Sequence, residues 1–490
     1  MFKLKNGYII VGIRHARTTQ KKEKRKNMKD IIWDKAQIEL ATGGKPRGAD
    51  NWLISGISID SRKINEGDLF IALTGDNFDG HAFINHALAK GAKAALVQYI
   101  PDGLAKDAPI IVVPDCYEAL RDLAIFKRKN FTGEIIAITG SVGKTSTKEM
   151  LFAAFSAVGK SYCTQGNLNN HIGLPLSVAR MADDTKFGIF EMGMNHADEI
   201  SPLSVIAKPD ISVITNIEAV HLENFNSLSG IADAKSEIFD GMSEGKIAIL
   251  NRDNKYFTHL KEKALDKRLQ IISFGELEGS DSKLLEFSEK NGVSSVKANI
   301  RGEEISYKLN LPGKHQVLNS LAVLSIVSAS NSNLDIAIEG LESLKATAGR
   351  GLTSELEIDG KKITLIDDTY NASPASVKAA ISNLASIKAE KNARAVIALG
   401  DMLELGNDEV QMHVDISKKL VENKIDLVFT AGDLSKHLFD ALPDNMKGSW
   451  AKDSQSLSKL IKPSLQDGDI LLIKGSRGME MENVVKFEKN

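Results

Sequence analysis

The sequence predicts an α/β protein of three domains, with a doubly wound and mostly parallel sheet in the central one. The length of 490 residues corresponds to about three domains of about 150 residues each. Short apolar runs alternate with helix-like segments along most of the chain, which is typical of sheets covered by helices on both faces. One run, 135–138, leads directly into a glycine-rich turn and a helix-like segment. This order of strand, turn and helix is typical of a P-loop.

A small N-terminal α/β domain is expected over residues 28–109. Helix-like spacing begins at Ile31 and stops at Gly43 and Gly44, because glycine often ends a helix. Polar turns and a helix-like segment at 81–91 separate the expected strands, which are 54–59, 69–73 and 94–97.

The central domain is expected over residues 110–346. It begins with a strand at 110–113 and a helix at 117–129. The strand at 135–138 and the glycine-rich turn precede a helix at 145–157. Further strands, which alternate with helices, are expected at 187–190, 211–214, 247–250 and 271–274. A polar, strand-rich interruption at 284–311 and an apolar helix at 315–328 complete the domain.

A third, Rossmann-like α/β domain is expected over residues 347–490. Helices separate its expected strands, which are 352–358, 362–366, 395–399, 427–430 and 470–473.

The net charge of −2 combines two unlike parts. Residues 1–27 carry nine Lys and Arg and one acid, which leaves −10 on the rest of the chain. Such an acidic body gives no reason to expect a nucleic-acid partner. We expect the basic N-terminal extension to be a disordered tail, or to precede a functional start at Met28. The alternative is that the extension is an arm that binds an anionic surface. A signal peptide is not expected, because the apolar stretch of the extension, at 8–11, is too short.

Two cysteines, Cys116 and Cys163, are too few for a disulfide framework or a cysteine-rich zinc site. They fit a reducing compartment, so a cytoplasmic protein is expected. No apolar run reaches 18 residues, and therefore no membrane-spanning helix is expected.

The glycine-rich turn, residues 139–146, reads Thr-Gly-Ser-Val-Gly-Lys-Thr-Ser. Its glycines let backbone N–H groups point at phosphate oxygens, and the following helix adds partial positive charge. Lys144 is suited to the β- and γ-phosphates of a nucleotide, and the Thr145 hydroxyl to Mg²⁺. The strict pattern is not met, because Ile138 stands where the first glycine is usual. An ordinary turn with a surface lysine is the alternative.

A carboxylate follows the strand expected at 187–190. Glu191 is a candidate Mg²⁺ ligand, because Mg²⁺ prefers hard oxygen ligands. A solvated or capping glutamate is the alternative.

The chain resembles the Mur peptide ligases over residues 28–490, since motifs of all three domains occur in order. The segments that carry the resemblance are 58–62, 67–73, 79–81, 139–145, 166–175, 191–195, 215–223, 235–239, 251–254, 312–315, 367–374, 399–406 and 474–477. Folylpolyglutamate synthases share the phosphate turn. The stretches DDTYNASP, GDMLELG and KGSR point to the members that add D-alanyl-D-alanine. Ser146 and Ser373 replace the Thr and Asn that are common in the family.

The resemblance implies an ATP-dependent acid–D-amino-acid ligase of peptidoglycan synthesis, and so a role in cell-wall biogenesis, cell shape and cell division. ATP would phosphorylate the terminal carboxylate of a UDP-N-acetylmuramoyl-tripeptide, and D-Ala-D-Ala would attack the acyl phosphate. The N-terminal domain would bind the UDP-muramoyl substrate and the central domain ATP, while the C-terminal domain would close over ATP and bind the dipeptide.

The implied cofactors are ATP and two Mg²⁺ ions, and a monomer is expected. Diaminopimelate and lysine are both open as the third peptide residue. Another Mur ligase, a folylpolyglutamate synthase and a P-loop ATPase without ligase chemistry are the alternative functions.

The resemblance also implies roles for single residues. Lys144, His221 and Lys235 would be catalytic, and Mg²⁺ would be held by Thr145, Glu191, His221 and a carbamate on Lys235. The residues expected at ATP are Thr139, Gly140, Ser141, Val142, Gly143, Lys144, Thr145, Ser146, His315, Asn319, Arg350, Asp367, Tyr370 and Asn371. The residues expected at the other substrates are Ser61, Arg62, Asn169, Asn170, His171, Lys474, Ser476 and Arg477.

Four of these assignments have plainer alternatives. His221 could be a loop or core histidine, and Lys235 a lysine on a helix surface. Arg62 could form a surface ion pair, and Tyr370 could be a core aromatic residue.

Overall fold

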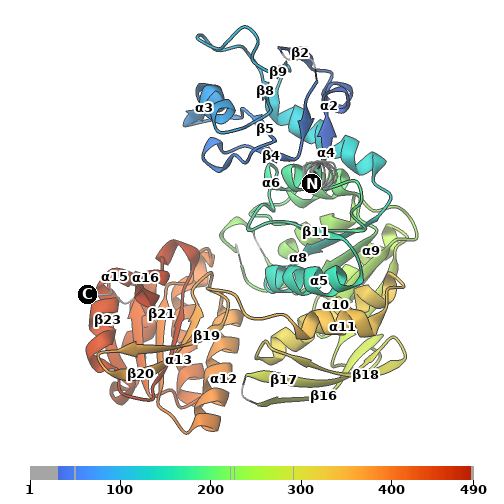
Figure 1. Cartoon of the computed structure of the whole chain (residues 1–490). Helices are drawn as coiled ribbons and strands as arrows, with labels where there is room; N and C mark the ends of the chain where they lie inside the picture. The colour runs from blue at the N-terminus through green and yellow to red at the C-terminus, as the bar shows by residue number, and fades with distance from the viewer. Residues whose placement is uncertain (1–30, 49–50, 221, 226, 291, 487–490) are drawn as a thin grey trace, which may run out of the picture. The chain divides into compact units, whose positions relative to one another are not determined.

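The computed structural model describes residues 31–48, 51–220, 222–225, 227–290 and 292–486 (Figure 1). Two compact units divide them: the described residues up to 133 join 164–188, and residues 134–163 join those from 189 onward. Parallel strands and helices alternate in both units, which confirms the predicted α/β class. The basic extension at 1–27 lies outside the described residues. The domain boundaries after residues 109 and 346 remain predictions.

The first unit is built on a five-stranded sheet in the order β2–β9–β8–β5–β4. Strand β2 pairs antiparallel with β9, whereas the other neighbours pair parallel. The strands are β2 (Lys45–Arg47), β4 (Gly56–Ser58), β5 (Asp68–Ile71), β8 (Ala94–Val97) and β9 (Ile110–Val112). Two small pairs accompany the sheet, β1 (Trp33–Asp34) with β3 (Leu53–Ile54) and β6 (Thr74–Gly75) with β7 (Phe78–Asp79). The helices are α2 (Lys35–Thr42), α3 (Ile84–Ala89), α4 (Cys116–Asn130) and α6 (Gly173–Ala179).

Helix α2 confirms the first helix predicted from the sequence, although it starts four residues later. The Asp34 carboxylate accepts the Gln37 N–H at 2.8 Å, and the Gln37 side chain accepts the Asp34 N–H at 2.9 Å. This reciprocal cap satisfies two backbone donors at the helix start. Gly43, with φ of 64°, follows the last helical residue, as glycine commonly does.

The second unit contains a nine-stranded sheet in the order β11–β12–β10–β13–β14–β15–β16–β17–β18. Strands β10, β13, β14 and β15 run parallel, and β16 to β18 form an antiparallel extension. The extension explains the polar, strand-rich interruption at 284–311. The strands are β10 (Glu134–Thr139), β11 (Ser161–Cys163), β12 (Phe187–Glu191), β13 (Ile211–Ile214), β14 (Ile247–Asn251), β15 (Gln270–Gly275), β16 (Ser282–Lys290), β17 (Val293–Ile300) and β18 (Glu303–Leu309). The helices are α5 (Lys144–Val158), α7 (Ile200–Ala207), α8 (Leu228–Ser236), α9 (Phe257–Asp266), α10 (Lys314–Ala329) and α11 (Leu334–Glu342).

The same unit contains a six-stranded sheet in the order β19–β20–β24–β21–β22–β23. Only the pair of β19 and β20 is antiparallel among these strands. The strands are β19 (Leu352–Ile358), β20 (Lys361–Asp368), β21 (Ala395–Gly400), β22 (Leu427–Ala431), β23 (Lys447–Ala451) and β24 (Ile470–Lys474). The helices are α12 (Pro374–Lys391), α13 (Glu409–Glu422), α14 (Asp433–Asp440), α15 (Ser454–Ile461) and α16 (Glu482–Val485). Strand β23 was missed by the sequence analysis, because only Trp450 and Ala451 of its residues are apolar apart from glycine.

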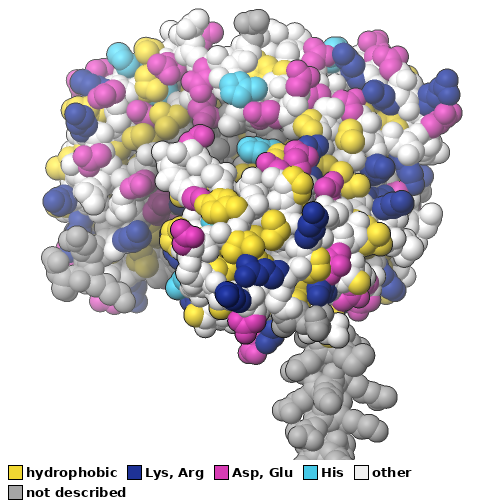
Figure 2. Space-filling view, turned by 90° about the horizontal axis from the view of Figure 1, so that it is seen from above, with side chains coloured by type: hydrophobic (Ala, Val, Ile, Leu, Met, Phe, Trp, Pro, Cys, Tyr) yellow, Lys and Arg dark blue, Asp and Glu magenta, His cyan; other side chains and the backbone are white. Residues whose placement is uncertain are grey.

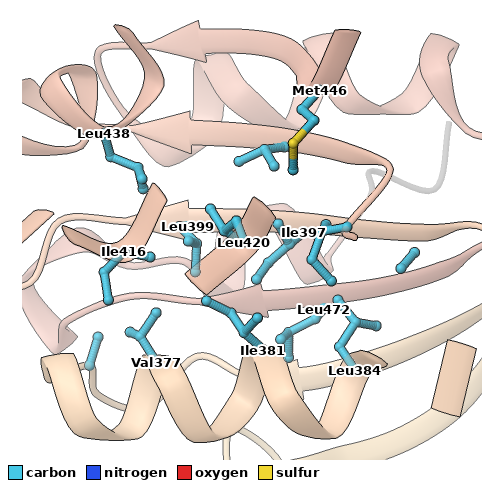
Figure 3. Close-up of a cluster of buried hydrophobic side chains, with 14 of the residues drawn as sticks. Val377, Ile381, Leu384, Ile397, Leu399, Ile416, Leu420, Leu438, Met446 and Leu472 are labelled. Carbon is cyan, nitrogen blue, oxygen red and sulfur yellow. The ribbon is translucent and has the colours of Figure 1, made fainter. Parts of the chain in front are cut away.

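Apolar residues at helical spacing join α12 to this sheet. Val377, Ile381 and Leu384 lie on one face of the helix and point toward Ile397 and Leu472 (Figure 3). The residues on either side of Ile397 in strand β21, Val396 and Ala398, belong to a second apolar cluster. The alternation places one apolar cluster on each face of the sheet.

The molecular surface mixes charges of both signs. Figure 2 shows Lys and Arg side chains interspersed with Asp and Glu over one face. No helix within the described ranges combines the length and the apolar composition that a membrane span requires.

Candidate functional site

The glycine-rich turn joins strand β10 to helix α5, as the sequence predicts. Gly140 and Gly143 have φ angles of 148° and 86°, which residues with side chains rarely adopt. A Cβ on Gly140 would lie 2.0 Å from the Thr215 hydroxyl oxygen, so the turn requires glycine for space as well. Gly143 is the N-cap of α5 and has no side chain to cap it. The helix N-terminus, with the half-buried Ser146 in its first turn, is therefore suited to an anion.

The segment after strand β13 holds the turn in place. The Ser141 N–H donates to the Asn216 carbonyl at 2.8 Å, and the Ser141 hydroxyl donates to the Glu218 carbonyl at 3.0 Å. The Thr215 hydroxyl donates to the Val142 carbonyl at 2.6 Å. These bonds fix the backbone of the turn before any ligand binds, and such preorganisation favours phosphate binding.

Lys144 lies inside the turn rather than on an open surface. Its Nζ donates to the Gly140 carbonyl at 2.6 Å. Desolvation lowers the pKa of Lys144, the Glu191 charge raises it, and the Arg350 charge lowers it. The plain surface lysine that the sequence left open is therefore excluded.

Thr145 and Glu191 meet beside the turn. The Thr145 hydroxyl donates to Glu191 Oε2 at 3.0 Å. Glu191 ends strand β12 and is 3% exposed, which excludes a freely solvated glutamate. The adjacent Thr139 hydroxyl donates to the Met192 carbonyl at 2.9 Å. Two hard oxygen donors thus converge where β10 and β12 end, and this donor chemistry fits Mg²⁺.

The predicted metal ligand His221 lies outside the described residues. Within the described ranges, no group of three or more His, Cys, Asp or Glu side chains is arranged to hold a metal ion. The Thr145–Glu191 pair is therefore the part of the predicted Mg²⁺ site that the structure brings together.

Lys235 lies in helix α8 and is 1% exposed. The alternative of a lysine on a helix surface is therefore wrong. Burial lowers the pKa of Lys235 well below its usual range, the Lys144 charge lowers it further, and Glu237 opposes both effects. The lowered pKa favours the neutral amine, which is the form that reacts with electrophiles.

Helix α10 carries two predicted nucleotide residues. A Cβ on Gly143 would lie 2.9 Å from Asn319 Oδ1, so Asn319 packs directly against the phosphate turn. His315 lies one turn earlier, in the exposed first turn of α10. Asn319 can therefore reach a ligand bound at the turn from the side of α10.

The segment before strand β19 is tied to the end of strand β20. Asp367 Oδ2 accepts the Gly349 N–H at 2.8 Å, and its Oδ1 accepts the Thr369 hydroxyl at 2.7 Å. The Arg350 guanidinium lies 3.9 Å from the centre of the Tyr370 ring, a cation–π contact. Tyr370 is half-buried and packs against this arginine, so it is not a purely core aromatic residue.

The predicted residues at the end of strand β24 differ in exposure. Lys474 is buried, and its Nζ donates to Asp368 Oδ2 at 2.7 Å and to the Asn371 carbonyl at 2.8 Å. Ser476 is also buried, and its hydroxyl accepts the Leu403 N–H at 2.9 Å. Arg477 is exposed and pairs with Glu482 at 3.0 Å. Only Arg477 of these three is open to a ligand without rearrangement.

Ser61 and Arg62 lie in the first unit, in a short 3₁₀ helix (Ser61–Lys63) that follows strand β4. Ser61 is buried, whereas the Arg62 side chain is 84% exposed. Its guanidinium makes a two-pronged contact with the Asp60 carboxylate, at 2.9 and 3.0 Å. The surface ion pair that the sequence left open is therefore present.

The first unit also contains the loop of Asn169, Asn170 and His171, before helix α6. Asn170 Oδ1 accepts the Gly173 N–H at 2.9 Å and so helps to start α6. The exposed His171 packs edge-on against Tyr117, with ring centres 5.9 Å apart.

Sequence reasoning assigned no role to Asn216, Glu218, Asn251 and Asn254, although they fall within the matched segments 215–223 and 251–254. Their side chains link the segment that supports the phosphate turn to the end of strand β14. The signal available in the sequence was the clustering of amide side chains directly after two predicted strands.

Comparison with known proteins gives consistent matches along the chain. Three family models match: the Mur ligase family catalytic domain at 53–128, the Mur ligase middle domain at 138–327, and the Mur ligase glutamate ligase domain at 355–477. The UDP-N-acetylmuramoyl-tripeptide–D-alanyl-D-alanine ligase of Rickettsia prowazekii is 35% identical over 93% of this chain and 100% of that protein.

Solved structures show the same similarity. MurF from Acinetobacter baumannii superposes with a TM-score of 0.81 and 30% identity, over 92% of this chain and 98% of that chain. MurF ligase from Thermotoga maritima, solved in complex with ADP, has a TM-score of 0.74 and 28% identity, over 88% of this chain and 96% of that chain.

Proposed function

The chain belongs to the Mur ligase family, and we propose that it joins D-alanyl-D-alanine to a UDP-N-acetylmuramoyl-tripeptide in an ATP-dependent reaction of peptidoglycan synthesis. The names of the full-length relatives support this substrate pair. The observation that carries the proposal is the phosphate turn, with Lys144 inside it and the Thr145–Glu191 oxygen pair beside it. The ADP complex of the Thermotoga maritima relative supports nucleotide binding in this fold.

The chemistry explains why ATP is needed. A carboxylate is a poor electrophile, so transfer of the γ-phosphoryl group to the terminal carboxylate of the tripeptide creates a leaving group. The amine of D-Ala-D-Ala then attacks the acyl carbon, loses a proton, and expels phosphate with the former carboxylate oxygen. The products are the UDP-linked pentapeptide, ADP and phosphate. The protein mainly positions two anions and neutralises their repulsion.

Lys144 and the turn would bind the phosphates, while Asn319, His315, Arg350, Asp367, Tyr370 and Asn371 would surround the rest of ATP. Asn319 is the best supported of these six, because it packs against Gly143. The Asp367 carboxylate accepts hydrogen bonds from Gly349 and Thr369. This supports an indirect role, in which Asp367 positions the neighbouring Arg350 for ATP.

Thr145 and Glu191 would hold Mg²⁺, and His221 with a Lys235 carbamate would complete a second site. Mg²⁺ would supply positive charge beside the phosphates. The lowered pKa of Lys235 favours the neutral amine, which is the form that adds CO₂. The resulting carbamate would turn a buried cation into an oxygen ligand.

Ser61, Arg62, Asn169, Asn170 and His171 would bind the UDP-muramoyl substrate. The exposed Arg62 guanidinium could exchange Asp60 for a diphosphate, because both offer paired oxygens. Lys474, Ser476 and Arg477 would line the dipeptide side, and the exposed Arg477 is suited to a carboxylate. The protein would act as a monomer, and sedimentation velocity would test this oligomeric state.

Product analysis tests the proposal. Purified protein is incubated with ATP, Mg²⁺ and D-Ala-D-Ala, and with the diaminopimelate or the lysine form of the tripeptide. With at least one of the two tripeptide forms, mass spectrometry should show one pentapeptide formed for each ADP produced. Phosphate release at the same rate without both peptide substrates would instead indicate a P-loop ATPase without ligase chemistry.

A further inference from the structure

The phosphate turn rests on a segment that has no regular secondary structure. Residues 215–218 follow strand β13 and belong to no helix or strand, yet they accept or donate the bonds that fix Ser141 and Val142. An irregular segment can support the turn only if it is itself fixed, because ordering a flexible backbone costs conformational entropy.

Two asparagines at the end of strand β14 fix this segment from behind. Asn251 Nδ2 donates to the Thr215 carbonyl at 3.1 Å. Asn254 Nδ2 donates to the Ile217 carbonyl at 3.1 Å and also to Asn216 Oδ1. Both asparagines are half-buried, so water competes only partly for these bonds.

Asn216 continues the network toward the turn. Its Nδ2 donates to Glu218 Oε1 at 3.1 Å. The Glu218 carbonyl in turn accepts the Ser141 hydroxyl. Desolvation raises the pKa of the half-buried Glu218, while its bond to Asn216 and the charges of Lys255 and Lys378 lower it.

The network requires amide side chains rather than any polar group. Asn251 Oδ1 accepts the Asp253 N–H at 3.0 Å, and Asn254 Oδ1 accepts the Tyr256 N–H at 2.9 Å. Each asparagine therefore accepts from its own turn and donates to segment 215–218. An aspartate of the same shape could accept but not donate, and its charge would face a carbonyl oxygen.

We propose that Asn251 and Asn254 are positioning residues of the nucleotide site, which hold the phosphate turn in its binding shape through residues 215–218. The inference rests on the proposed function, because it takes the turn to be the ATP site. Loss of one bond leaves the fold intact but lets the turn relax. Nucleotide affinity then falls, whereas affinity for the dipeptide is unchanged.

The test uses Asn254→Asp in the full chain, with Asn130→Asp as the matched control. Asn130 Nδ2 also donates to a carbonyl, that of Phe126 at 2.8 Å, but on the exposed end of α4. ADP binding is measured by titration calorimetry, and KM is measured for ATP and for D-Ala-D-Ala. We expect ADP binding to be weaker by about tenfold or more, with a matching rise in KM for ATP, because the aspartate can donate neither of the two Nδ2 hydrogen bonds. KM for D-Ala-D-Ala should stay within about twofold of wild type, as should all values of the control.

A second variant and a mutant cycle keep the inference testable if Asn254→Asp does not fold. Asn251→Ser is too short to reach Thr215 and should weaken ADP binding in the same selective way. When either asparagine variant is combined with Ser141→Ala, the loss of ADP binding free energy should be smaller than the sum of the two single losses, because both substitutions act through the same turn.

Folded variants that bind ADP within about twofold of wild type would overturn the inference, and so would equal rises of KM for ATP and the dipeptide. A wild-type protein that does not bind ADP would overturn the proposed function together with it.

Discussion

Gly140→Ala is the substitution that the phosphate turn should tolerate least. Gly140 has φ of 148°, and its added Cβ would lie 2.0 Å from the Thr215 hydroxyl oxygen and 3.1 Å from the Thr215 nitrogen. The neighbouring atom at 3.1 Å belongs to backbone, so it cannot swing away. The Thr215 side chain must move, and its 2.6 Å bond to the Val142 carbonyl is lost with it.

Two costs set the size of the effect. An alanine in this backbone region costs about 1–3 kcal/mol, and the lost Thr215 hydrogen bond about 1 kcal/mol. The turn relaxes to another shape to avoid them, and a bound nucleotide must then force it back. We therefore expect ADP to bind about 30- to 700-fold more weakly, since each 1.4 kcal/mol is a factor of ten.

Titration calorimetry with ADP measures this loss, and circular dichroism checks that the variant is folded. Gly245→Ala is the matched control, because Gly245 has φ of 81° and no atom lies within 4 Å of its added Cβ. It adds backbone strain away from the turn, so its ADP affinity should be unchanged. A folded Gly140→Ala protein that binds ADP within about threefold of wild type would show that the turn does not need glycine at this position.

Three further outcomes are expected. Lys144→Ala should abolish turnover while far-UV circular dichroism remains that of wild type; retained turnover would remove the lysine from the mechanism. Lys235→Ala should lose most activity and regain part of it with formate or acetate, whereas no rescue and no added mass of CO₂ on the wild-type lysine would argue against a carbamate. Burial and the Asp210 charge raise the pKa of Glu134 to about 7, so the folded state binds this proton more tightly than the unfolded state and the free energy of unfolding falls as pH rises toward 7. In urea unfolding, Glu134→Gln should therefore be more stable than wild type by about 1–2 kcal/mol at pH 8, after allowance for partial exposure. The gain should be smaller at pH 5. An equal gain at both pH values would show that it does not come from the ionisation of Glu134.

The parts of the fold that depend on local pattern were predictable from the sequence. The buried strand 135–138 and the turn after it indicated the phosphate site, because glycines at this spacing between a strand and a helix are typical of phosphate binding. The helix after Ile31 was also predictable from its glycine stop, although its start was not. Strand β23 was not predictable, since Lys447, Gly448 and Ser449 are placed in the sheet by their neighbours rather than by their own preference.

The contacts of the site were harder to predict, because they join residues far apart in the chain. The meeting of Thr145 with Glu191 depends on the order of strands in the sheet. The meeting of Gly143 with Asn319 depends on the packing of helix α10 against α5. The burial of Lys235 could not be read from helix α8 alone, since a lysine within an amphipathic helix is usually solvated. The amide network behind the turn links three separate strand ends, and spacing along the sequence does not show which of them become neighbours.

Phosphorylation of the tripeptide carboxylate at this site can be followed with ¹⁸O. The protein is supplied with a tripeptide that carries ¹⁸O in its terminal carboxylate, together with ATP and D-Ala-D-Ala, and the mass of the released phosphate is measured. Transfer of the γ-phosphoryl group to the carboxylate predicts one ¹⁸O atom in each phosphate and one in each new amide carbonyl. Phosphate without ¹⁸O, released while pentapeptide forms, would show that the carboxylate is not phosphorylated.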